Sequence, residues 1–386
     1  MPEPARRGAI LASPSVSQPG ELDRLNAILE EAGLGRPLGR PELSMSEVVM
    51  LPVSEDPQKV VAALRRVAPE GGDHHCEAPA NYGIHTIKHR TRRDGLVAAE
   101  GFTPKFSAKG LKSGHGTVSW EVVRKRAMPR KPPWRPPDSP PVVVVLDSGV
   151  KQHPWLPKTK HPKFCVDAGE LGFSPAVPVP DHALDNGNFG AYWGHATFLA
   201  GLIRVHAPDA TVLSVKLMND AGKIDDHNVV PALNWLLEHI ENGGVADVVL
   251  MAFGRARKPD EPNPHILTQL IAKLRHKKGV EFVASAGNDH SHDKTIPACL
   301  DNVVSVGAGI SANDREWYSN YGPWVREWRP GTAVSLMPLT GLEDRDNNEG
   351  DGNGFALWSG TSFSAAVLAG ELAQARARER AAGGGS

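Results

Sequence analysis

The region from Val142 to Ala308 alternates short, continuous apolar runs with longer amphipathic segments. The short runs are rich in valine and occupy 142–146, 211–217, 246–253, 280–286 and 303–308. The longer segments have helical spacing of their apolar residues and occupy 195–203, 229–240 and 265–276. A strand that is apolar at every position has both faces buried, which is typical of a parallel sheet between two layers of helices. We therefore expect an α/β fold with a doubly wound, mostly parallel sheet.

A proline-rich seam, MPRKPPWRPPDSPP at 128–141, precedes this region. Its prolines stiffen the backbone and remove hydrogen-bond donors, so we place a domain boundary there. Ahead of the seam, 46–53 has the composition of a strand, and 56–67 follows as a helix with Asp56 at its cap and Pro57 at its first position. The 386 residues then divide into an N-terminal segment (1–39), a small αβ unit (40–87), a basic proline-rich linker (88–140), a large α/β domain (141–380) and a glycine-rich tail (381–386).

Charge and cysteine content indicate which partners and which cellular compartment to expect. Lys+Arg 43 against Asp+Glu 44 gives a formal net charge of -1, which argues against nucleic acid as a partner. No continuous apolar stretch follows Arg6 and Arg7, and no run of about 18 apolar residues occurs, so we expect neither export nor a membrane partner. Three widely spaced cysteines, Cys76, Cys165 and Cys299, fit a reducing compartment. We expect a cytoplasmic protein of bacterial origin.

One acidic segment, EDRDNNEGDGN, raises the question of calcium. Asp344, Asp346 and Asn348 alternate as the ligands of a calcium-binding loop do. The sixth position, where a glycine is needed, is Glu349, and the twelfth, where a bidentate glutamate is needed, is Phe355. The segment therefore reads better as a loop beside a cleft than as a calcium site. The cysteines and histidines of the chain do not have the spacing of zinc ligands. We expect no required cofactor, with calcium at this segment as the open alternative.

Four polar residues lie at strand ends or helix starts, where parallel sheets gather functional groups. Asp147 and Asn288 each follow a predicted strand, His195 begins a predicted helix, and Ser362 lies in GTSFSAAVLAG at 360–370. Each has an ordinary structural explanation, because Asp and Asn form turns and a serine in the first turn of a helix caps free N–H groups. The alternative for Ser362 is a nucleophile at the positive end of a helix, which requires a base, an orienting acid and an oxyanion donor elsewhere.

Together these stretches resemble the subtilisin-like serine proteases. That family carries its aspartate, histidine, asparagine and serine in the order met here, whereas other serine hydrolase folds use other orders. LDSGV resembles the family's aspartate motif, GHATFLAG its histidine motif and GTSFSAAVLAG its serine motif. Three further segments resemble the family between these motifs: ADVVLMAFG (246–254), TIPACLDNVVSVGA (295–308) and YSNYG (318–322). The similarity spans roughly 140–375 and implies the subtilisin type of sheet.

The resemblance implies a serine endopeptidase. His195 would take the proton of Ser362 during attack on a peptide carbonyl, with Asp147 orienting His195. Asn288 and the Ser362 backbone N–H would bind the oxyanion. Extended substrate would pair with the neighbouring strands by strand addition. The residues expected to contact it are Leu217, Gly222, Met251, Phe253, Gly254, Ala286 and Gly287.

The chain departs from the family pattern at several positions beside these motifs. Ala196 stands where the family usually has glycine, and Phe198 where it has histidine. Ala366 and Val367 stand in place of proline and histidine. None of these changes removes a catalytic group. MAFG at 251–254 replaces the usual Ser-Leu-Gly, so the pocket preference of the best-known members should not be transferred.

The front half resembles, more weakly, the inhibitor-like propeptide of the same family. The resemblance rests on the strand at 46–53, the helix after it and CEAPANYGI at 76–84. A tail containing Tyr82 would then enter the cleft as an intramolecular inhibitor. The following segment, 88–135, carries 13 Lys+Arg against 3 Asp+Glu. It is either a solvated linker or a surface that docks onto the acidic large domain or a partner.

We expect an intracellular endopeptidase that acts on polypeptides. Two other functions remain open. The first is a catalytically silent module that keeps the fold in order to hold extended peptides, and the second is an amidase or esterase. Labelling by a serine-directed fluorophosphonate distinguishes an enzyme from a silent module, because only an activated Ser362 reacts.

Overall fold

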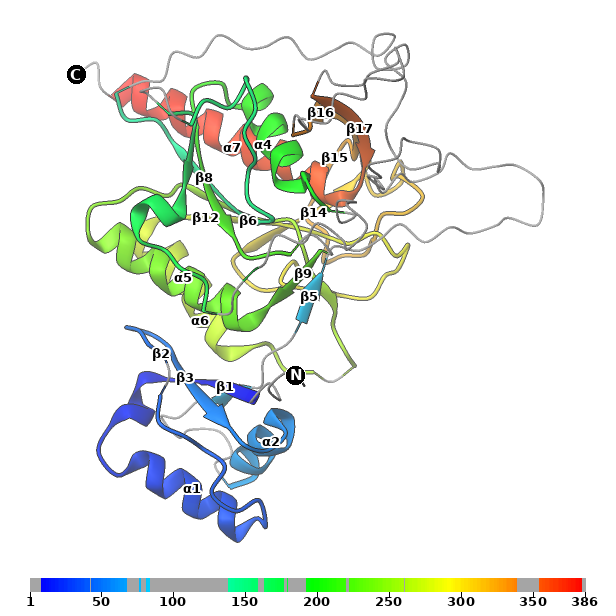
Figure 1. Ribbon diagram of the computed structural model, residues 1–386. Coiled ribbons are helices and arrows are strands. Elements are labelled where there is room, and N and C mark those ends of the chain that lie inside the picture. Colours follow the sequence, from blue (N-terminus) through cyan, green and yellow to red (C-terminus); the bar gives the residue numbers. More distant parts are fainter. Residues whose placement is uncertain are drawn as a thin grey trace, which may run out of the picture.

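The computed structural model describes residues 8–41, 43–67, 76–77, 81–83, 138–158, 163–176, 179, 192–219, 222–259, 261–338 and 354–383. The described residues form a small unit from the front of the chain and a large unit that follows the proline-rich seam (Figure 1). Almost all of the expected linker 88–140 lies outside the described residues, as does the acidic segment 343–353.

The large unit is built on a seven-stranded sheet, and each paired strand runs parallel to its neighbour. In spatial order the strands are β15 (Glu327–Arg329), β14 (Val303–Ala308), β12 (Glu281–Ser285), β10 (Val248–Met251), β6 (Val142–Asp147), β8 (Thr211–Lys216) and β7 (Cys165–Asp167). The chain passes from β6 to β8 on one side and then to β10 on the other, so the winding direction reverses at β6. The predicted doubly wound α/β fold is confirmed.

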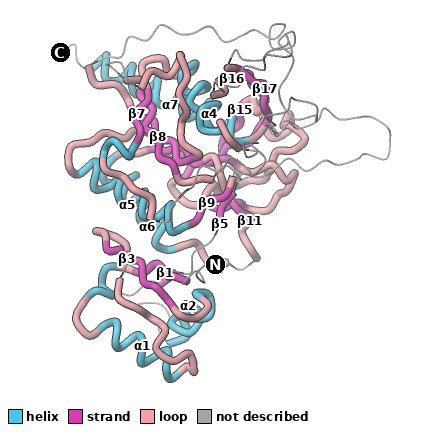
Figure 2. The backbone as a smooth tube through the Cα atoms, viewed as in Figure 1, coloured by secondary structure: helices cyan, strands magenta, loops and turns pink. Residues whose placement is uncertain are grey.

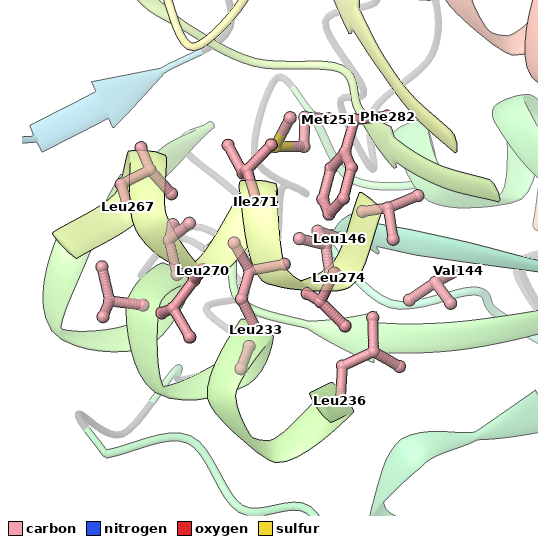
Figure 3. Packing of buried hydrophobic residues seen from close by; sticks show 14 of the residues in the cluster. Val144, Leu146, Leu233, Leu236, Met251, Leu267, Leu270, Ile271, Leu274 and Phe282 are labelled. Atoms are coloured by element: carbon pink, nitrogen blue, oxygen red, sulfur yellow. The ribbon is translucent and has the colours of Figure 1, made fainter. Parts of the chain in front are cut away.

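Helices cover both faces of this sheet. They are α4 (His195–His206), α5 (Asp226–Glu241), α6 (His265–Lys278) and α7 (Thr361–Gly383). Because successive strand residues point to opposite faces, Val143 and Val145 of β6 pack with α4 and α7, whereas Val144 and Leu146 pack with α5 and α6. Figure 3 shows the second layer, where leucines of α5 and α6 close over the sheet beside Phe282. The continuous valine runs are therefore buried on both sides.

Short elements complete the large unit near the carboxyl ends of its strands. They are the 3-10 turn η2 (Ala168–Leu171) and the strands β9 (Lys223–Asp225), β11 (Arg255–Ala256), β13 (Thr295–Ile296), β16 (Thr332–Leu336) and β17 (Phe355–Ser359). β11 pairs with β13 and β16 pairs with β17, both antiparallel.

The small unit has a β-α-β-β-α-β order with an antiparallel sheet arranged β2-β3-β1-β4, which is the ferredoxin-like arrangement. Its elements are β1 (Gly8–Ala12), the 3-10 turn η1 (Pro14–Ser17), α1 (Glu21–Glu31), β2 (Leu43–Ser44), β3 (Val49–Val53), α2 (Pro57–Val67) and β4 (Cys76–Glu77). The Gln58 N–H donates to the Asp56 carboxylate over 2.8 Å at the start of α2.

The domain limits drawn from the sequence differ from this arrangement at both ends. We separated 1–39 from the unit 40–87, yet β1 pairs with β3 along its whole length, and Leu25 and Leu29 of α1 share one core with α2. At the other end, α7 continues to Gly383, into the stretch that we assigned to the glycine-rich tail. The missed signal in α1 is the spacing of its leucines, which a helix brings to one face.

The small unit contacts α5 and α6 with the open face of its sheet (Figure 1). In β1, Ile10 and Ala12 point into the core of the small unit, whereas Leu11 between them belongs to the core of the large unit. A further strand, β5 (Asn81–Gly83), lies apart from the small sheet and pairs antiparallel with β9 (Figure 2). The front of the chain therefore touches the large unit in two places.

Candidate active site

Asp147 and His195 form a buried pair between the end of β6 and the start of α4. His195 Nδ1 donates to Asp147 Oδ2 over 2.9 Å and lies 3.0 Å from Oδ1. Each side chain is only 1% exposed. Because the carboxylate holds the proton on Nδ1, Nε2 carries the lone pair of the neutral ring. Nε2 is buried and accepts no hydrogen bond from the part of the chain that the structure describes, so it is available as a base.

Ser148 connects the two elements that carry this pair. Its backbone N–H donates to Asp147 Oδ1 over 2.7 Å, and its Oγ accepts from the backbone N–H of Ala196 over 3.3 Å. One residue thus orients the carboxylate and fixes the start of α4 against the end of β6. The sequence analysis did not assign Ser148 a role, although it adjoins Asp147 in LDSGV.

Aromatic rings enclose the His195 imidazole. Trp358 and Tyr192 contact it edge-on, with ring centroids 5.4 and 6.1 Å away, and Phe363 contacts it at 5.6 Å. Burial raises the pKa of Tyr192 to about 12, so its hydroxyl stays protonated. Gly194 allows the close approach of α4 to the β16 end, because its φ is 88° and a Cβ there would lie 2.7 Å from Pro338 Cδ.

Ser362 is the second residue of α7 and is 3% exposed. Its Oγ donates to the carbonyl oxygen of Ala252 over 3.1 Å, just beyond β10. The adjacent Phe363 contacts the His195 ring, so the start of α7 lies beside the imidazole. The hydroxyl must therefore turn from Ala252 toward Nε2 before a proton can pass, and such bonds often form only in the complex with substrate.

Asn288 lies just past β12, beside the start of α7. Its Oδ1 accepts from both the backbone N–H and the Oγ1 hydroxyl of Thr361, each over 2.9 Å. This leaves Nδ2 on the opposite edge of the amide, 3.4 Å from the position of a Cβ built on Gly360. Amide N–H groups at a helix N-terminus next to Ser362 are suited to an oxyanion. Thr361, which also accepts from Gly287 N over 3.1 Å, was not assigned by the sequence analysis.

Three of the residues expected to contact substrate turn their side chains into the protein. Leu217, Met251 and Phe253 are each at most 1% exposed and belong to the core beneath α5 and α6. The Leu217 N–H donates to the Asp147 carbonyl oxygen over 2.9 Å. Only the backbone groups of these three residues can therefore contact a substrate peptide.

The other four lie around the candidate groups. Gly222 packs against the Tyr192 ring, since a Cβ there would lie 2.4 Å from Cδ2, and Gly254 directly precedes β11. Ala286 and Gly287 lead into Asn288, and their carbonyl oxygens accept hydrogen bonds from Asn320. These four residues thus lie on the segments that follow β8, β10 and β12.

Other kinds of site were sought in the same residues. Within the described ranges, no three His, Cys, Asp or Glu side chains gather as metal ligands would. The helices described here include none with the length and apolar character needed to cross a membrane. The acidic segment considered for calcium lies outside the described residues.

Comparisons with known proteins identify the family of the large unit. The subtilase family model matches residues 138–382. The chain is 29% identical to Subtilisin-like protease 1 of Arthroderma otae over 185 residues, covering 46% of this chain and 34% of that protein. It is 28% identical to Subtilisin-like protease 5 of Arthroderma benhamiae over 245 residues, covering 61% and 55%. It is 24% identical to Subtilisin-like protease 1 of Trichophyton rubrum over 333 residues, covering 78% and 62%. The chain thus matches less than two thirds of the length of these relatives.

Solved structures with a similar backbone include two proteases. One is a cold adapted subtilisin-like serine proteinase, at 22% identity and a TM-score of 0.43, with 61% of this chain and 75% of that chain covered. The other is the prenylagaramide maturation protease PagA, at 21% identity and a TM-score of 0.44, with 62% and 77% covered.

Proposed function

The chain belongs to the subtilase family of serine proteases, whose model matches residues 138–382, and from that membership we propose that it is an endopeptidase acting on extended polypeptides. The observation that carries this proposal is the buried pair of Asp147 and His195, whose Nε2 accepts no hydrogen bond within the described residues and whose ring lies beside the start of α7. Ser362 and Asn288 meet at that same helix start. The proposal is supported because side chains with the chemistry of a base, an orienting acid, a nucleophile and an oxyanion donor lie near these elements.

In the proposed reaction, Ser362 Oγ attacks the peptide carbonyl while His195 Nε2 takes its proton. Asp147 stabilises the imidazolium that results. Asn288 Nδ2 and the Ser362 N–H donate to the oxyanion, and His195 then protonates the leaving amine. Water enters, is deprotonated by His195 in turn, and releases the acyl group from Ser362.

We propose further that substrate binds by adding a strand beside β9. Strand β5 of the same chain supports this mode, since Asn81, Tyr82 and Gly83 pair antiparallel with β9, with Tyr82 opposite Ile224. β5 also contacts β11. Backbone pairing on such an edge accommodates many sequences, because the strand recognises the main chain and only pockets distinguish side chains.

We propose that the small unit is an intramolecular inhibitor. It contacts the helices beneath the site through the turn before β3, where Ser46 N–H donates to Glu238 Oε1 over 3.1 Å. Glu47 N–H donates to Asn234 Oδ1 over 2.8 Å, and the Glu47 carboxylate pairs with Lys273 of α6. While the unit stays docked, β5 occupies the edge that a substrate strand would use.

A silent peptide-binding module is the second candidate, because the Ser362 hydroxyl bonds to Ala252 instead of His195. Fluorophosphonate labelling separates the two. We expect the full chain carrying Lys273→Glu, in which one docking contact is broken, to be labelled, and the same chain with Ser362→Ala to stay unlabelled. Absence of label on both the wild type and Lys273→Glu would exclude the enzyme.

The unpaired thiols of Cys165 and Cys299 support the proposal that the protein works in a reducing, cytoplasmic compartment. Burial raises the pKa of the Cys165 thiol to about 12, so this group is also protected from oxidation while the domain is folded. Both observations concern the large unit alone.

A further inference from the structure

The loop that carries Asn288 follows β12 and is attached to a second loop, which follows the neighbouring strand β14. The first loop spans 286–291, and the second, 317–322, contains the YSNYG sequence. Asn320 lies between them and is 2% exposed. The reaction proposed above uses Asn288 but leaves this buried amide without a role.

The Asn320 side chain bonds to backbone groups on both sides of Asn288. Its Oδ1 accepts from two N–H groups that follow Asn288, over 2.9 and 3.0 Å, and its Nδ2 donates to a carbonyl that precedes it, over 2.9 Å. The Asn320 backbone N–H donates to another preceding carbonyl over 2.9 Å. The four partners are Asp289 N, Ser291 N, Ala286 O and Gly287 O.

The chemistry of this position requires an amide. Oδ1 faces donors only, whereas Nδ2 faces Ala286 O and, at 3.4 Å, Thr295 Oγ1. Aspartate would place an acceptor against the Ala286 carbonyl, and leucine would leave buried N–H and C=O groups unpaired. An asparagine alone presents both kinds of group in this volume.

Other bonds between the loops do not involve the Asn320 side chain. His290 N–H donates to Tyr318 O, and Tyr321 N–H donates to Ser291 O, each over 2.9 Å. These contacts attach the far end of the first loop. The Asn320 side chain therefore fixes the backbone on both sides of Asn288, while Thr361 accepts from Gly287 N and holds the Asn288 amide itself.

We propose that Asn320 is a positioning residue that acts through Asn288. By fixing the backbone before and after Asn288, it holds Nδ2 where negative charge develops during the reaction. An oxyanion donor is effective because it is already in place when the charge forms, so small displacements reduce turnover. This inference rests on the proposed function.

The test combines Asn320→Leu with Asn288→Ala in the full chain carrying Lys273→Glu. Turnover of a chromogenic peptide amide gives kcat and KM for each single variant, the double variant and the parent. We expect Asn320→Leu to lower kcat about tenfold with KM within about twofold, because the lost interaction is made in the transition state. In the Asn288→Ala background, the same substitution should have no further effect on kcat, which is the signature of two residues acting as one unit.

Ser305→Ala is the matched control. Ser305 is also fully buried, and its Oγ accepts from Arg326 N and donates to Trp324 O, away from 286–291. It should lower Tm without changing kcat. If Asn320→Leu does not fold, Asn320→Ala removes the same side-chain bonds without adding bulk and replaces it in the cycle.

Three results would overturn the proposal. An equal loss of kcat in both backgrounds would mean that Asn320 acts independently of Asn288, and a fall in Tm with unchanged kcat would make it purely structural. A parent chain without turnover would overturn the proposed function and this inference together. If the parent turns over substrate, the first two results count against the role of Asn320 and not against the proposed function.

Discussion

The hydroxyl of Ser362 and the imidazole of His195 do not bond to each other. Ser362 donates to Ala252, and Nε2 of His195 accepts nothing from the described chain. Rotation about one side-chain bond of the serine changes its partner without moving the backbone. The proposed proton transfer therefore requires the Ser362 hydroxyl to leave the Ala252 carbonyl.

Replacing His195 with alanine should lower turnover by at least about 10⁴-fold, because His195 is the group that takes the Ser362 proton in the proposed reaction. Folding should persist, since the core of α4 is formed by its other buried residues. Peptide hydrolysis and the far-UV circular dichroism spectrum measure the two effects. His153→Ala, at another buried histidine, is the control and should keep most of the activity. Near-normal hydrolysis by a folded His195→Ala variant would remove His195 from the role of base.

Replacing Thr361 with valine should lower kcat about tenfold and leave KM nearly unchanged. Valine keeps the shape of the side chain but loses the hydroxyl that holds Asn288 Oδ1 and accepts from Gly287 N. Steady-state kinetics with a peptide amide measures the change. Thr332→Val, whose part-buried hydroxyl bonds to Ser359, provides the control. Equal effects of the two substitutions would show that the loss is not specific to the oxyanion site.

At the scale of single residues, the sequence predicted Asp147, His195, Asn288 and Ser362 as candidates, because each stands at a strand end or helix start and in a family-like motif. It was insufficient for Ser148, Thr361 and Asn320. Their roles depend on hydrogen-bond partners brought from distant segments, and no spacing along the chain encodes those partners. Nor did the sequence show that the side chains of Leu217, Met251 and Phe253, which we expected to contact substrate, point into the core.

Among the secondary structure elements, those buried on two faces were predictable. The strands β6, β8, β10, β12 and β14 and the helices α4, α5 and α6 all fall within the predicted runs or extend them by a few residues. Burial on both sides forces an unbroken apolar sequence, which leaves little ambiguity. α1 was missed because the residue at its N-cap is Gly20, which adopts a left-handed backbone conformation and provides no polar side chain as a cap.

The contact between α4 and α7 should make stability depend on pH. His206, the last residue of α4, lies against Gly370 of α7, and burial lowers its pKa from 6.5. The unfolded chain then binds the proton more readily than the folded one. Stability should therefore fall as pH drops below about 6.5 and level off below the folded pKa.

Tm measured from pH 7.5 to pH 5 should fall less in His206→Gln than in the wild type. The pKa of His239 is also lowered by burial, so part of the dependence should remain in the variant. Identical pH profiles for the two proteins would show that His206 contributes no proton linkage.

In the whole molecule, the docking of the small unit should be sensitive to one charge pair. Lys273→Glu and Glu47→Lys should each raise the activity of the full chain about fivefold, since a partly exposed pair contributes roughly 1 kcal/mol. The double variant restores opposite charges and should restore latency. Lys277→Glu, at an exposed position of the same helix, should have no effect. Activation by both single variants without restoration in the double would rule out direct pairing.

The antiparallel register of β5 and β9 gives the site a direction. Asn81 lies opposite Asp225 and Gly83 opposite Lys223, so the chain advances toward Gly222. Gly222 packs against Tyr192, whose ring meets that of His195. A peptide that pairs with β9 in the same direction as β5 would have its amino-terminal residues farther from His195 and its later residues nearer to it. For a peptide bond bound at Ser362 in the proposed mode, the small unit would lie on the acyl side, and cleavage would leave the new carboxylate on the small unit.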